Sequence, residues 1–185
     1  MTIAEKLRNT NRAEYLLYMW QVEDLIRAYH LDAERIAKEY VARFDLDKAQ
    51  KSQTEQWYAD LCRMMAEEGK REKGHLQICQ NILTGLDELH NQLVNSPKFP
   101  YYREMYYKVL PYIVELRAKN GTAAGQPQET GELQTCFELL YGLMILRLQG
   151  KPVAPNTEKA ARDVATLLGQ LSDYYFKNKQ EPIEF

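Results

Sequence analysis

Glu72 and His75, three positions apart, are the residues best suited to chemistry in this chain of 185 residues. If the segment is helical, residues i and i+3 lie one turn apart on the same face, so the carboxylate and the imidazole are neighbours. A Glu-x-x-His motif of this kind supplies metal ligands in the cores of some helical bundles. The pair is the candidate metal or ligand site. The alternative is a partly buried His75 that is hydrogen-bonded to a backbone carbonyl or to a carboxylate.

A second acid-x-x-His pattern, from Asp87 to His90, does not complete a metal site. His75 and His90 are separated by about 22 Å along one helix at a rise of 1.5 Å per residue, so they cannot bind the same ion. A di-metal site needs two such motifs on different helices and two further carboxylates. The sequence therefore supports no definite metal site, predicts no cofactor, and leaves catalytic residues unassigned.

Arg147 is a candidate for a buried charge network. Its helical position places it on the side of its helix that we expect to be buried. A buried guanidinium needs a carboxylate or several carbonyl groups, because an unpaired buried charge is strongly destabilising. The first long helix offers Glu14, Glu23 and Asp24 as partners. The alternative is that Arg147, in the last helical turn, extends into solvent and interacts favourably with the helix dipole.

Trp20 and Arg27 form, together with Glu23, a second patch beside the main apolar face of the first helix. Glu23 and Arg27 are an i,i+4 pair. Trp and Arg are enriched among the residues that dominate protein interfaces. The patch therefore predicts either another helix of the same chain packed on it or the seam of a homodimer.

Helical patterns recur along the whole chain, and no long stretch alternates apolar and polar residues with period two. The chain also has only 9 Gly and 7 Pro, few for a turn-rich β protein. We predict an all-α fold: one domain over residues 1–185, a helical bundle of about six to seven helices. The predicted helices are 3–30, 32–43, 47–68, 70–95, 100–118, 131–149 and 157–177.

Helix 131–149 has almost no polar side, which predicts that it is the central helix of the bundle. Before it, residues about 120–132 contain three Gly and one Pro, a composition that predicts a mobile surface loop. Residues 178–185 form a short, mostly polar C-terminal tail whose last apolar side chains we expect to dock on the body.

The composition argues against several classes of partner. There are 24 basic and 26 acidic residues and a net charge of −2, so no excess of positive charge recruits nucleic acid. The longest apolar run, residues 139–146, is far shorter than the roughly 20 residues that a membrane span needs. The three Cys predict buried free thiols in a reducing compartment, and the N-terminus lacks a signal-peptide pattern. We therefore expect a cytoplasmic protein without nucleic-acid or membrane partners.

Several segments together resemble one family of proteins. They are residues 13–27, 72–77, 96–100, 110–117 and 139–148. They are similar to uncharacterised proteins of about this length from Bacteroides-like bacteria, which are classed as a domain of unknown function. The resemblance covers nearly the whole chain and implies one cytoplasmic domain. It implies no activity, cofactor or catalytic residue.

The helix faces, the Trp20 patch and the lack of a strong catalytic motif favour a non-catalytic helical module. We expect such a module to bind a second copy of itself, as a homodimer, or an unidentified protein. The alternative is a metal- or small-ligand-binding enzyme centred on His75 and Glu72.

Overall fold

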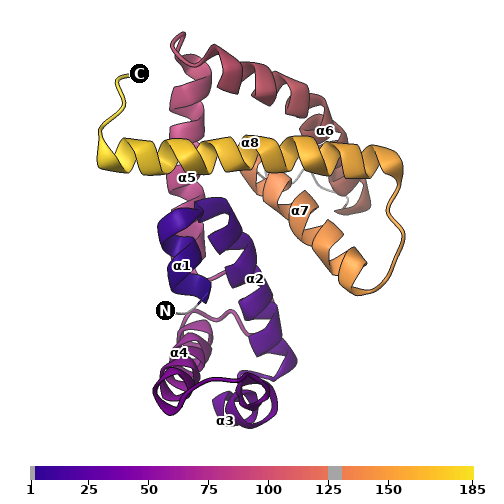
Figure 1. Cartoon of the computed structure of the whole chain (residues 1–185). Helices are drawn as coiled ribbons and strands as arrows, with labels where there is room; N and C mark the ends of the chain where they lie inside the picture. Colours follow the sequence, from indigo (N-terminus) through magenta and orange to yellow (C-terminus); the bar gives the residue numbers. More distant parts are fainter. Residues whose placement is uncertain (1–2, 125–130) are drawn as a thin grey trace.

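The structure is a computed structural model that describes residues 3–124 and 131–185. These residues form eight α-helices, two short helices of other types and connecting loops, without a strand, so the predicted all-α class is confirmed (Figure 1). The elements are α1 (Ile3–Thr10), α2 (Arg12–Ala28), α3 (Ala33–Arg35), η1 (Ile36–Tyr40), η2 (Val41–Arg43), α4 (Lys48–Glu67), α5 (Gln77–Asn95), α6 (Pro100–Ala124), α7 (Glu132–Leu148) and α8 (Pro155–Gln180).

The predicted helix 3–30 is two helices, α1 and α2, which are separated at Asn11 and pack against each other. Asn11 has an extended backbone, with φ −153° and ψ 101°, and its side chain accepts a hydrogen bond from the Glu14 N–H at 3.1 Å. This is the geometry of an N-cap, which starts a new helix. The apolar periodicity continues across the break, so it did not reveal the change of direction.

The segment after α2 changes its winding twice, from α3 to the π turn η1 and then to the 3₁₀ turn η2. A π turn bonds residue i to i+5. Residues five apart, such as Ile36 and Val41, are then brought to the same side of the chain, and both are buried. The same turn places the Tyr40 ring 5.8 Å from the ring of Tyr58 on α4.

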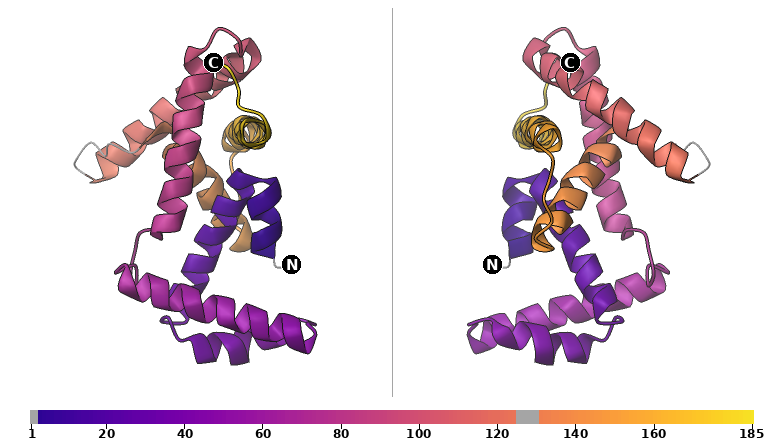
Figure 2. Two further views of the ribbon diagram at one scale, coloured as in Figure 1. Left: turned by 90° about the vertical axis from the view of Figure 1, so that its left-hand side faces the viewer. Right: turned by 90° about the vertical axis from the view of Figure 1, so that its right-hand side faces the viewer.

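The predicted helix 70–95 begins only at Gln77, and residues 68–76 form a loop between α4 and α5. Gly69 and Gly74 have φ values of 67° and 86°, a left-handed conformation that glycine adopts without strain. The loop places α4 in a layer with α3 that lies across one end of α2, while α5 extends toward the opposite end of the molecule (Figure 2).

Helix α8 crosses the molecule and packs on α2, α5, α6 and α7 (Figure 1). Its buried side is rich in small and aliphatic residues: Ala160, Ala161, Val164, Leu167, Leu168, Leu171 and Ser172. The central position expected for α7 is not confirmed. The first half of α7 is buried, but its second half is only partly covered and Leu148 is 74% exposed.

The ends of two helices differ from the prediction. Helix α6 continues to Ala124, so the expected loop 120–132 begins later, and residues 125–130 of that loop lie outside the described residues. Helix α8 continues to Gln180, and beyond it the Phe185 ring lies 5.8 Å from the ring of Phe99. Within the described ranges, no helix has the length and apolar character needed to cross a membrane.

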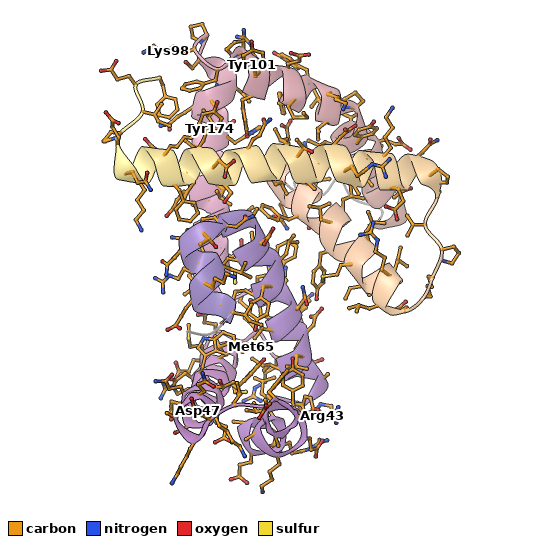
Figure 3. All side chains as sticks on the ribbon, in the orientation of Figure 1. Arg43, Asp47, Met65, Lys98, Tyr101 and Tyr174 are labelled. Atoms are coloured by element: carbon orange, nitrogen blue, oxygen red, sulfur yellow. The ribbon has the colours of Figure 1, made fainter. Side chains whose placement is uncertain are left out.

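Side chains fill the space between the helices, as the view with all of them drawn shows (Figure 3). Met65 is fully buried between α4 and its neighbours, whereas Tyr101, at the start of α6, lies on the surface. All three cysteines, Cys62, Cys79 and Cys136, are buried free thiols, as expected from the sequence.

His90 is buried in the core and its Nδ1 lies 2.7 Å from the Tyr102 hydroxyl. Burial lowers the pKa of His90, against smaller opposing attractions from Asp87 and Glu132. The unfolded chain binds a proton here at about pH 6.5, whereas the folded chain binds it only at lower pH. His90 therefore contributes a loss of stability as the pH falls through about 6.5.

We predict that replacing His90 by Gln reduces the loss of unfolding free energy between about pH 7 and pH 5.5. The measurement is urea unfolding at both pH values for the wild type, His90→Gln and His30→Gln. His30 is exposed, so His30→Gln is the control for removing a histidine from the surface. An equal pH dependence in the wild type and His90→Gln would contradict the prediction.

Candidate functional site

Glu23, on α2, is the most completely buried acidic side chain described, with 0% of its surface exposed. One carboxylate oxygen accepts the Leu76 N–H at 2.9 Å, and the other lies 2.6 Å from Nδ1 of His75. Burial, and after it the nearby Glu23 carboxylate, raises the pKa of the Cys79 thiol. A buried carboxylate is stable only when donors surround it, and Glu23 obtains these from the start of α5 and the loop before it.

His75 lies between this carboxylate and an aromatic ring. Its imidazole stacks on Trp20, with ring centroids 4.1 Å apart and planes inclined by 13°. The Glu23 carboxylate accepts, so Nδ1 carries a proton and Nε2 is the nitrogen left for other contacts. The His75 side chain is 25% exposed, so its imidazole lies at the edge of the surface. The bond to Glu23 and the stacking on Trp20 fix its orientation there.

Arg27, one turn after Glu23, binds the backbone of the same loop. Its Nε donates to the Lys70 carbonyl at 3.2 Å, and its guanidinium also donates to the Gly74 carbonyl. The third interaction of the guanidinium is an ion pair with Asp24 at 2.7 Å. Helix α2 therefore holds both carbonyl and N–H groups of the α4–α5 loop.

Tyr141 connects this arrangement to α7. Its hydroxyl donates to the Asp24 carboxylate, and its ring meets Trp20 edge-on with centroids 5.6 Å apart. Burial and the hydrogen bond to Asp24 raise the pKa of Tyr141. We call these six side chains the Glu23 cluster: Trp20, Glu23, Asp24, Arg27, His75 and Tyr141.

The helical alignment expected for Glu72 and His75 is not formed. Glu72 lies exposed in the α4–α5 loop because the helix that would have aligned the two begins only at Gln77. His75 does have a carboxylate partner, but it is Glu23. Among the described residues, no group of three or more His, Cys, Asp or Glu is arranged to hold a metal ion.

The expected buried network of Arg147 with Glu23 or Asp24 is not formed. Arg147 is 58% exposed and donates to Glu158, in the first turn of α8, at 2.6 Å. The last turn of α7 lies next to the start of α8, so the nearer acid is Glu158. Glu23 and Asp24 do come together, but with His75, Tyr141 and Arg27.

Trp20 is not available as an interface anchor, because it is buried by its own chain. His75 stacks on it, and Phe137 and Tyr141 of α7 meet it edge-on. Of the two explanations for the patch on α2, the intramolecular one holds. Arg27 is likewise occupied by the α4–α5 loop.

A groove of about 360 Å³ lies beside the Glu23 cluster, between α2 and α7, with η1 and α4 at its end. We call it the α2–α7 groove. Among the described side chains that line it, Asp24 is the one that carries a charge. The others are Tyr18, Gln21, Val22, Leu25, Ala28, Tyr40, Tyr58, Tyr141, Ile145 and Leu148.

Three tyrosines, Tyr18, Tyr40 and Tyr58, lie together at the end of the groove. Burial, reinforced by the neighbouring Tyr18 and Tyr40, raises the pKa of Tyr58. The groove therefore offers aromatic rings, neutral hydroxyls, aliphatic side chains and one carboxylate. Sequence reasoning missed it, because the tyrosines come from separate elements; the only signal was the high count of 13 Tyr.

This fold and this site define an all-helical domain with a buried carboxylate–imidazole pair and an aromatic groove. Residues 1–182 match the family described as Domain of unknown function (DUF4924), and the chain belongs to that family. Neither a curated protein nor a solved structure matches the chain.

We predict that Glu23→Ala lowers the free energy of unfolding by about 3 kcal/mol, since it leaves the Leu76 N–H and His75 without their acceptor. His75→Ala removes one partner of the Glu23 carboxylate, so we expect the free energy of unfolding to fall by about 2 kcal/mol. Urea unfolding measures both changes.

Glu72→Ala is the matched control, because it removes a carboxylate from the exposed side of the same loop. It should change the stability no more than an ordinary surface substitution. If His75→Ala were as harmless as Glu72→Ala, the imidazole would not contribute to stability and a different role would be needed.

Proposed function

We propose that this domain is a non-catalytic helical module that binds a protein partner, and that the α2–α7 groove is its binding site. One observation carries the proposal: α7 is apolar on nearly every side, yet its second half is only partly covered by its own chain. A helix that is apolar all round is normally buried. The uncovered side chains are therefore suited to a partner.

The lining of the groove describes the chemistry of its occupant. Leu25 and Ile145 are partly exposed apolar walls, and the aromatic rings add apolar surface. Asp24 is exposed and paired with Arg27, but only Asp24 of this pair lines the groove, so the charged group at the groove edge is a carboxylate. The occupant that fits is an apolar helical turn with a cationic side chain beside it, which is the helix-in-groove mode of recognition.

The Glu23 cluster supports the groove by setting its width. Asp24 of α2 and Tyr141 of α7 both line the groove, and they are joined by a hydrogen bond. Trp20, behind them, contacts α7 through Phe137. The two walls are thus held in place before a partner arrives, which reduces the entropy lost on binding.

We predict that phenethylammonium, an apolar cation, shifts the methyl NMR signals of Leu25 and Ile145. Phenylacetate, an anion of similar size, should not, because Asp24 repels it. The titration is recorded on dilute protein, so that copies of the chain do not compete for the groove.

Ala28→Trp places a large side chain in the groove and should abolish the response to phenethylammonium. Val114→Trp, on the exposed outer face of α6, is the control and should preserve it. Equal responses to both probes, or shifts confined to other methyl groups, would refute the groove as a site with this chemistry.

A second candidate function is that of a metal- or small-ligand-binding enzyme centred on His75. The sequence pattern predicts Glu72 as the acidic partner of His75 in such a site. One observation favours it: Glu23 fixes Nδ1 of His75, an arrangement that orients histidine ligands and bases in known sites. The Glu72 part of this hypothesis has no support from the geometry.

Elemental analysis of untagged protein purified without chelators separates the two functions. The interaction module predicts no stoichiometric zinc, iron or manganese. Near-stoichiometric metal that is lost in His75→Ala, with an unchanged thermal midpoint, would instead favour the second candidate.

A further inference from the structure

The surface beside the α2–α7 groove carries a side chain that matches the groove. Leu148, the last residue of α7, is 74% exposed and lies at the rim of the groove. An exposed leucine next to an apolar hollow gives one surface both a projection and a recess. Such a surface can be complementary to itself.

We infer that the occupant of the groove is the C-terminal turn of α7 from a second copy of this chain, an inference that rests on the function proposed above. A two-fold axis brings the same patch of each copy together. Leu148 of each copy then enters the groove of the other, and both hollows are filled at once.

The charges around the two surfaces agree with this arrangement. Lys151, three residues after Leu148, is an exposed cation, and Arg147, just before Leu148, is exposed as well and pairs with Glu158 of its own chain. The charged side chain that lines the groove is Asp24, and it is exposed as well. Each copy therefore places cations near the acid of the other. The net charge of −2 adds little overall repulsion between copies.

The outer face of α6 is the competing surface. Tyr107 and Val114 are each 59% exposed there, on the side of α6 that does not face the core. Neither side chain lines the α2–α7 groove, so this face offers exposed apolar side chains away from that recess. It therefore supplies the matched control.

The test is sedimentation velocity over a range of protein concentrations. The wild type should form a dimer, and both Leu148→Asp and Ala28→Trp should weaken it by about thirtyfold or more, as expected for a side chain at the centre of an interface. Both positions are exposed, so circular dichroism should show folded variants. Val114→Asp, on α6, should dimerise like the wild type.

A wild type that stays monomeric at every concentration would overturn the inference. A dimer that is unaffected by Leu148→Asp and Ala28→Trp, or is broken by Val114→Asp, would also overturn it. The response of Leu25 and Ile145 to phenethylammonium is measured separately. If that response persists in a monomeric protein, this inference fails while the groove remains the binding site.

Discussion

The buried carboxylate of Glu23 is the interaction on which the rest of the structure depends. A charge inside a protein must be surrounded by donors, and Glu23 takes them from residues more than fifty positions away. This requirement fixes the α4–α5 loop against α2 and determines where α5 starts. Arg27 binds two carbonyl groups of the same loop, so one helical face satisfies both kinds of backbone group. Through Asp24 and Tyr141 the same face also determines the position of α7.

The helical class could be predicted because apolar spacing is a local property of the chain. The breaks were harder, since they depend on single residues within an otherwise helical pattern. Asn11 starts a new helix with one side-chain hydrogen bond, and Gly74 takes a left-handed conformation that ends the regular pattern before α5. The partner of His75 could not be found in the sequence. Glu72 was the near candidate by spacing, whereas Glu23 is close only after the chain folds.

The position of α7 illustrates a similar limit. Helix α7 is the most apolar of the long helices. Composition predicts how much apolar surface a helix has, but it does not predict which element covers that surface. Helix α8 packs on α7 and on three other helices, and its buried side contains Ala160 and Ala161, whose small side chains allow close approach. The exposure of Arg147 has the same cause. Arg147 lies in the last turn of α7, beside α8, and pairs with Glu158 instead of entering the core.

The three buried thiols make the chain convenient for site-specific labelling. Burial raises the pKa of Cys62, Cys79 and Cys136, in the last case to about 12, so each is protonated near neutral pH. Only the thiolate reacts with maleimides. A cysteine introduced at an exposed position would therefore react first, and the native cysteines could stay in place. A fluorophore or spin label can then be attached to this domain without replacing a single core residue.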